Sequence, residues 1–301
     1  MTLLLVALHL AIAAPPPPLA AGECFVMAPP TGAETVLGGD ECDRRTLPAS
    51  TFKIPHALVA LATGVVTAKT VMTWDGAKKD FPVWERNHSL DSAIKSSVVW
   101  FFQRAAESIG RQRELQYLRA FRYGSQGFQR EVTAFWLNGD LTISPREQVA
   151  FLQRMFSYDL PVDRGHIDAV KAAMTMPRGK VLNASGAHDF RLEWPADTIV
   201  RLKTGNGGAS GERVSWLIGQ LETGGRQYVF ASRRRSSGDA LDSVAGANLA
   251  QRLLNTMTPG RVSGARGVQP SVPSIAGMKG LRAVSGSRAR FSVGALRALR
   301  Q

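Results

Sequence analysis

Residues 48–58 read PASTFKIPHAL, and two polar side chains stand out among the apolar neighbours in this stretch. Ser50 and Lys53 are three positions apart, so one turn of helix would bring the hydroxyl and the amine to the same face. A serine becomes a nucleophile when a base removes its proton, and a lysine can be that base if its ammonium form is disfavoured. A helix N-terminus at Ser50 would also stabilise an oxyanion. A capping serine followed by a lysine that extends toward solvent is the alternative interpretation.

A second polar motif, Lys203-Thr204-Gly205, lies 150 residues after Lys53 and follows the alternating segment 199–202. The alternation predicts a strand, and at a sheet edge Lys203 and Thr204 would offer a cation and a hydroxyl to a substrate carboxylate. Gly205 removes side-chain bulk, so that a ligand can lie against the strand. A strand that simply ends in a turn is the alternative. The separation of the two motifs is typical of serine penicillin-recognising enzymes.

The order of the expected elements predicts a mixed α/β fold. A capping box at Ser144 begins a helix in the middle of the chain, and a last helix spans residues 241–253. Strands at both ends with helices between them predict one central antiparallel sheet built from both chain termini, with flanking helices and an inserted all-helical region. The expected strands are residues 23–28, 34–37, 198–202, 214–221 and 228–232.

Basic residues gather at the C-terminal end of the chain. The net charge is +13, and residues 261–301 contribute +8 of it, with seven Arg, one Lys and no acidic residue. This segment is rich in Gly, Ser and Ala and cannot bury much apolar surface, so we expect residues 259–301 to be a disordered basic tail. A tail that binds nucleic acid or membranes is the alternative. The rest of the chain carries too little excess charge to suggest a nucleic-acid partner.

The N-terminal residues have the pattern of a secretory signal. Residues 1–13 are apolar but too short to span a bilayer, and a proline run with small residues follows. We therefore expect a signal peptide at 1–21, a catalytic domain at 22–258, no stable membrane span, and a secreted protein, periplasmic in a Gram-negative bacterium. Cys24 and Cys42 would form a disulfide in that oxidising compartment, with two free thiols as the alternative.

The region between the two motifs indicates the subclass. Class A β-lactamases place Ser-Asp-Asn there, whereas this chain has Ser97-Val98-Val99 followed by the aromatic residues 100–102. We expect a helical turn that buries the aromatic side chains and lets the hydroxyl of Ser97 reach a catalytic centre.

With these motifs in this order, the chain resembles the class D, or oxacillinase-type, serine β-lactamases. The resemblance runs from about Cys24 to Met257 and excludes the tail after Pro259. Besides 48–58 and 203–205, it is carried by Ser97-Val98-Val99 with Gln103, Phe121-Arg122-Tyr123-Gly124, Phe135-Trp136-Leu137, Leu141, Ile143-Ser144 and Trp216.

The resemblance implies hydrolysis of penicillin-type β-lactams through an acyl-enzyme on Ser50. In this family CO2 carboxylates the lysine equivalent to Lys53, and the resulting N6-carboxylysine is the general base for acylation and deacylation. This requires a desolvated, neutral lysine, so we expect Val99 and Phe102 to form apolar walls and Trp136 to donate its indole N–H to the new anion. CO2 or bicarbonate would be needed, with no other cofactor and no metal.

The family also assigns roles to the remaining motif residues. Ser97 would relay a proton to the departing lactam nitrogen, and Lys203, Thr204 and Gly205 would bind the substrate. The backbone N–H groups of Ser50 and Asn206 would form the oxyanion hole.

Some positions depart from the family pattern. Ser125 replaces a common asparagine, and Asn206 replaces a common aromatic residue. Many members place a carboxylate-binding arginine at the start of the last helix, where our alignment puts Asp242. The candidates to replace that arginine are Arg233, Arg234 and Arg235.

A non-hydrolytic penicillin sensor or penicillin-binding domain, acylated at Ser50, is the alternative to a β-lactamase. A basic nucleic-acid binder is supported only by the tail. The sequence predicts neither the ranking of β-lactam substrates nor the oligomeric state.

Overall fold

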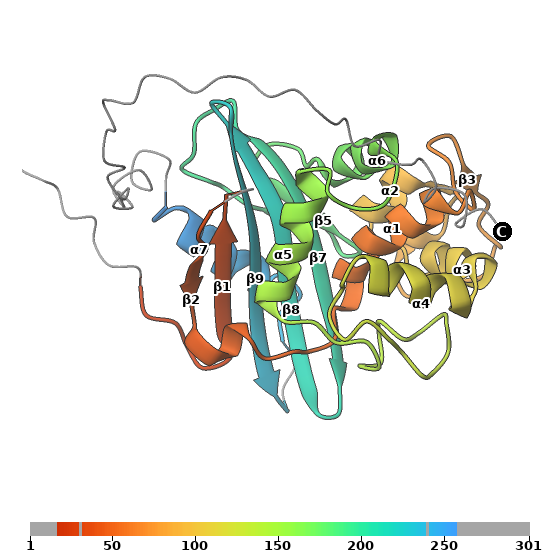
Figure 1. Cartoon of the computed structure of the whole chain (residues 1–301), viewed down its shortest axis with the longest axis horizontal. Coiled ribbons are helices and arrows are strands. Elements are labelled where there is room, and N and C mark those ends of the chain that lie inside the picture. The colour runs from red at the N-terminus through yellow and green to blue at the C-terminus, as the bar shows by residue number, and fades with distance from the viewer. Residues whose placement is uncertain (1–16, 30–31, 239–240, 258–301) are drawn as a thin grey trace, which may run out of the picture. The chain divides into compact units, whose positions relative to one another are not determined.

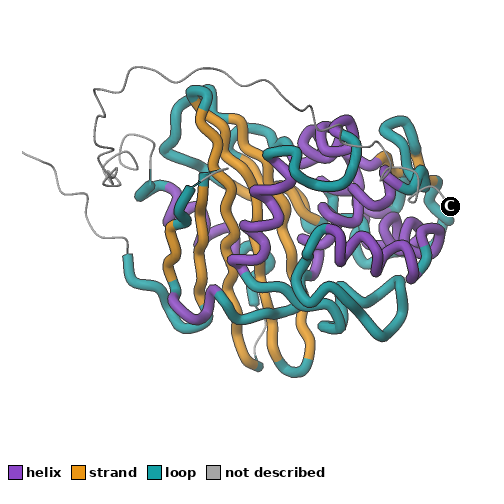
Figure 2. Tube along the Cα trace, in the orientation of Figure 1, coloured by secondary structure: helices purple, strands orange, loops and turns teal. Residues whose placement is uncertain are grey.

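The computed structural model describes residues 17–29, 32–238 and 241–257. A five-stranded antiparallel sheet in the order β2-β1-β9-β8-β7 forms its centre (Figures 1 and 2). The N-terminal strand β1 pairs with the C-terminal strand β9, which confirms the prediction of one sheet built from both ends of the domain. The strands are β1 (Glu23–Ala28), β2 (Thr35–Leu37), β7 (Ile199–Ala209), β8 (Glu212–Thr223) and β9 (Arg226–Ser237).

Helices cover both faces of this sheet, and all six residues of β1 are buried. Val26 packs in one apolar cluster with Val149 of helix α5 (Pro145–Phe156), whereas Phe25 packs in a second cluster with Leu249 of helix α7 (Ala245–Leu254). A strand covered on both faces is apolar throughout rather than alternating. The capping box at Ser144 begins α5 as predicted, because Ser144 and Glu147 each bond the backbone N–H of the other.

The remaining helices gather beside the edge strand β7, and residues between the strands supply them (Figure 1). This arrangement confirms the expected inserted helical region. The helices are α1 (Lys53–Ala62), α2 (Leu90–Lys95), α3 (Val99–Ile109), α4 (Arg111–Ala120) and α6 (Arg164–Met174). Short elements connect them: η1 (Gly39–Cys42), η2 (Ala49–Phe52), η3 (Pro82–Trp84), and the two-stranded pairs β3 (Val71–Met72) with β4 (His88–Ser89) and β5 (Lys180–Asn183) with β6 (Gly186–Asp189).

The structure differs from the sequence prediction at some boundaries. Strand β7 continues through the Lys203-Thr204-Gly205 motif to Ala209 instead of ending before it. The last helix begins at Ala245, because the backbone of Val244 is not helical.

Cys24 and Cys42 are joined by a disulfide, as expected, which ties β1 to η1. Most of the expected signal segment and all of the expected basic tail lie outside the described residues. Among the helices that the structure describes, we find none with the length and apolar character needed to cross a membrane.

Candidate active site

Ser50 and Lys53 lie on consecutive turns of the chain, where η2 leads into α1. Lys53 Nζ donates to Ser50 Oγ at 2.5 Å, so the predicted pairing of hydroxyl and amine is present. The backbone is under strain here, since Ala49, the residue before Ser50, has a φ of 48°. Lys53 is 0% exposed, and burial, with a smaller contribution from the charge of Lys203, lowers its pKa well below the usual value. A neutral amine at this distance can accept the Ser50 proton.

Ser97 connects the two lysines of the site. Its hydroxyl accepts from Lys203 Nζ at 3.0 Å and from Lys53 Nζ at 3.3 Å. The left-handed backbone of Ser97, with φ 54°, lies in the short connection between α2 and α3 and is uncommon for a residue other than glycine. Burial lowers the pKa of Lys203 to about 7. A hydroxyl between two easily deprotonated amines is well placed to relay a proton.

Strand β7 lies directly against the turn that carries Ser50. A side-chain Cβ at Gly205 would be 2.8 Å from Thr51 Cγ2 and 2.9 Å from Pro48 O, both distances shorter than van der Waals contact. Glycine is therefore required at Gly205 by the close approach of two backbone segments. The contact brings Thr204 and Asn206 to the cavity beside Ser50.

A chain of buried hydrogen bonds holds the same turn from the other side. Thr51 Oγ1 donates to Pro48 O at 2.7 Å, and Gln148 Nε2 of α5 donates to Thr51 Oγ1 at 2.8 Å. Tyr123 OH in turn donates to Gln148 Oε1 at 3.3 Å. Sequence reasoning missed Gln148, although a polar residue on the apolar face of α5 is the signal that indicates it.

Trp136 forms part of the apolar surroundings of Lys53. Its ring stacks on Phe52, the neighbour of Lys53, with centroids 5.6 Å apart, and Lys53 Nζ lies 5.9 Å from the centroid of Phe102. Trp136 is 0% exposed, yet within the described residues its Nε1 has no hydrogen-bond partner. A buried N–H without an acceptor is costly and is rare in folded proteins. Trp136, packed against Phe52 and His56 on either side of Lys53 in the sequence, therefore has a free donor for an additional acceptor.

The cavity beside Ser50 has a volume of about 160 Å³. It brings together the predicted residues Ser50, Ser97, Val99, Thr204 and Asn206. Leu137 of the Phe135-Trp136-Leu137 motif also lines it, and residues that the sequence did not indicate complete its wall: Phe81, Trp84, Asn183, Ala184, Ser185 and Ser243.

The start of the last helix differs from our alignment. Ser243 lines the catalytic cavity, whereas Asp242 accepts a hydrogen bond from Val244 N and lines a separate cavity.

None of the three candidate arginines replaces the family's arginine. Arg233 and Arg235 pair with Glu41, and Arg234 pairs with Glu23. No lysine or arginine is among the described residues that line the cavity, but Lys203 lies directly behind two that do, because its Nζ donates to Ser97 and to Thr204.

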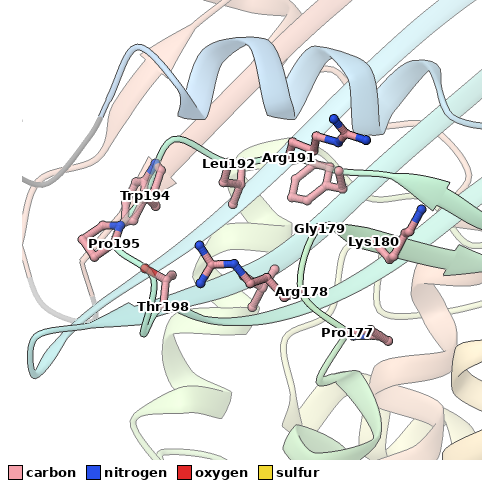
Figure 3. A pocket seen from close by; sticks show the side chains of 11 residues that line it. Pro177, Arg178, Gly179, Lys180, Arg191, Leu192, Trp194, Pro195 and Thr198 are labelled. Atoms are coloured by element: carbon pink, nitrogen blue, oxygen red, sulfur yellow. The ribbon is translucent and has the colours of Figure 1, made fainter.

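A larger cavity, of about 210 Å³, lies away from this chemistry (Figure 3). Trp194 and Pro195 form one end of it, and Lys180 and Arg191 lie at the other. Both cations pair with Asp189, and no member of its lining is a serine, cysteine or histidine. Among the described residues there is also no cluster of His, Cys, Asp or Glu able to hold a metal ion.

Comparison with known proteins agrees with this geometry. Residues 22–255 match the penicillin binding protein transpeptidase domain. The chain belongs to this family. The match spans the sheet, the helical region and all the motif residues described above.

Relatives within the family are class D β-lactamases. β-Lactamase OXA-48 of Klebsiella pneumoniae is 37% identical over 62% of this chain and 64% of its own length. The probable β-lactamase YbxI of Bacillus subtilis is 32% identical over 69% of this chain and 72% of its own length. The chain thus matches about two thirds of the length of these relatives. These similarities support the interpretation of the chain as a class D β-lactamase-type serine hydrolase, as the sequence motifs implied.

Solved structures show the same fold in both an enzyme class and a receptor. The class D β-lactamase YbXI from Nostoc has a TM-score of 0.69 and 28% identity, covering 78% of this chain and 93% of that one. The C-terminal domain of the BlaR penicillin receptor of Bacillus licheniformis has a TM-score of 0.66 and 27% identity, covering 83% of this chain and 92% of that one.

Proposed function

We propose that this protein hydrolyses penicillin-type β-lactams through an acyl-enzyme on Ser50. The observation that carries the proposal is the contact of a fully buried lysine with the serine, with Ser97 linking it to Lys203. Lys53 removes the proton of Ser50, Ser97 transfers a proton to the departing lactam nitrogen, and Lys203 with Thr204 holds the substrate carboxylate. The backbone N–H groups of Ser50 and Asn206 stabilise the oxyanion.

Lys53 acts in its carboxylated form in this proposal. CO2 would add to the neutral Nζ, one N–H proton leaving to water as the N–C bond forms, and would supply an anionic carboxylate able to accept a proton from serine and later from water. Two features of the chain fit this group: Lys53 is buried and readily neutral, and Trp136 Nε1 is a buried donor without a partner among the described residues. CO2 or bicarbonate is then the one requirement besides substrate.

The sequence pattern at the N-terminus and the disulfide support a proposal for the place of action. We propose export by the N-terminal segment to the periplasm of a Gram-negative bacterium, since the Cys24–Cys42 bond suits an oxidising compartment. A small-molecule β-lactam is the partner, and nucleic acid is not.

Purified protein given the chromogenic cephalosporin nitrocefin, with and without added bicarbonate, tests the activity. We expect turnover that bicarbonate increases and that the Lys53→Ala variant lacks. Absence of turnover under both conditions would contradict the proposal. An adduct on Ser50 without turnover would favour the second candidate, a penicillin sensor, which the similarity to the BlaR receptor domain supports.

A further inference from the structure

A buried pair of ionisable side chains, His56 and Glu114, lies behind Lys53 and has no role in the chemistry above. His56 follows Lys53 by three residues on α1, and Glu114 is in the first turn of α4. His56 Nε2 is 3.2 Å from Glu114 Oε1, and both side chains are 0% exposed. Burying an ionisable side chain costs free energy unless it is paired with another polar group or with a charge.

The imidazole of His56 forms part of the wall around Lys53. Its ring lies edge-on to Trp136 with centroids 5.4 Å apart, to Phe102 at 5.7 Å and to Phe52 at 5.3 Å. Lys53 Nζ lies 5.9 Å from the centroid of Phe102, and its charge acts on His56 through these buried rings. Such a charge is weakly screened there, because water is excluded.

The pair holds one proton between two sites at neutral pH. Burial raises the pKa of Glu114 to about 8, opposed by Arg113, whereas burial and then the charge of Lys53 lower the pKa of His56 to about 3. Glu114 therefore carries the proton while Lys53 is an amine or ammonium. Within the described residues, neither side chain has a hydrogen-bond partner, which leaves the 3.2 Å contact between His56 Nε2 and Glu114 Oε1 as the route for a proton between them.

We propose that His56 and Glu114 are positioning residues that stabilise an anionic carboxylate on Lys53 by moving a proton from Glu114 to His56. The Glu114 O–H bond breaks as an N–H bond forms at His56 Nε2, and no proton enters or leaves the pair. An imidazolium then faces the pocket and offsets the new negative charge, while the Glu114 carboxylate stays on the far side, next to Arg113. This inference rests on the proposed carboxylation of Lys53.

The test is the Glu114→Gln variant, which keeps the size of the side chain but cannot give up a proton. Titration with 13C-bicarbonate, followed by the carbamate carbon signal in NMR, measures carboxylation without relying on activity. We expect the variant to need about fivefold to tenfold more bicarbonate for half-carboxylation, within the range of coupling between contacting groups. Adding His56→Asn to it should cause little further loss, because the two residues act as one unit.

Glu147→Gln is the matched control, since it makes the same change at a partly exposed carboxylate of α5. Its half-carboxylation should equal that of the unaltered protein.

In the unaltered protein, the 15N signals of His56, assigned by their loss in His56→Asn, should move toward the imidazolium position as bicarbonate is added. This measurement needs no folded variant at Glu114. Equal bicarbonate requirements in Glu114→Gln and the unaltered protein would overturn the inference, as would unchanged His56 signals on carboxylation. A complete lack of carbamate in the unaltered protein would instead overturn the proposed lysine chemistry, and the inference with it.

Discussion

Replacing Trp136 with Phe removes one N–H donor and retains an aromatic ring in the same place. Without bicarbonate, the variant loses packing that contributes about 1–3 kcal/mol. It also no longer buries an unpartnered donor, whose burial costs a similar amount. We therefore expect the free energy of unfolding without bicarbonate to change by about 1 kcal/mol or less.

Trp136→Phe should differ from the unaltered protein when Lys53 carries a carboxylate. A hydrogen bond to a charged group contributes about 1.5–3 kcal/mol, so Trp136→Phe should need roughly tenfold to a hundredfold more bicarbonate for half-maximal nitrocefin hydrolysis. The assay is the initial rate against bicarbonate concentration at fixed pH. Trp84→Phe is the control, because Trp84 lines the same cavity but its Nε1 already donates to Ser96 O. An unchanged bicarbonate requirement in Trp136→Phe would refute the role given to the indole.

Three further predictions concern the strand, the substrate carboxylate and pH. Gly205→Ala should lower kcat/KM at least about tenfold and the free energy of unfolding by about 1–3 kcal/mol, because the added Cβ meets backbone atoms at the Ser50 turn. Gly207→Ala is the control, since its Cβ meets only side chains, and it should lower both quantities less. Ser243→Arg adds a cation to the catalytic cavity and should lower KM for penicillins several-fold with kcat little changed; a KM that stays the same would show that the substrate carboxylate lies elsewhere. The pKa of Lys203 is about 7 in the folded protein and near 10.5 in the unfolded protein. Between pH 7 and pH 10.5, Lys203 therefore carries a proton in the unfolded state but not in the folded state. Lys203 should thus contribute a rise of about 2–3 kcal/mol in the free energy of unfolding from about pH 7 to about pH 9, measured as the difference between the unaltered protein and Lys203→Met in denaturant titrations.

The sequence predicts those features that depend on neighbours along the chain. Ser50 and Lys53 meet because one turn separates them, and the Ser144 capping box begins α5 through contacts within four residues. The edge strand with Lys203 was predicted from its alternation, although its full length was not, since small residues 205–209 hide the strand pattern.

Features that depend on contacts between distant segments escaped prediction. Gln148 reaches Thr51 across 97 residues, and Glu114 meets His56 only because α4 packs beside α1. Ser243 lines the catalytic cavity and Asp242 a separate one because of how the segment before α7 packs against distant parts of the chain, which no local pattern determines. The three consecutive arginines 233–235 looked like a substrate site because Glu41 and Glu23, their partners, are distant in sequence.

Mass spectrometry of the intact protein at successive times after addition of penicillin tests the central claim most directly. In bicarbonate buffer, the account predicts an adduct on Ser50 that appears and then disappears as substrate is consumed, whereas Lys53→Ala forms little adduct or keeps it. A Ser50 adduct that persists in the unaltered protein after free penicillin is removed would contradict hydrolysis and identify a sensor instead.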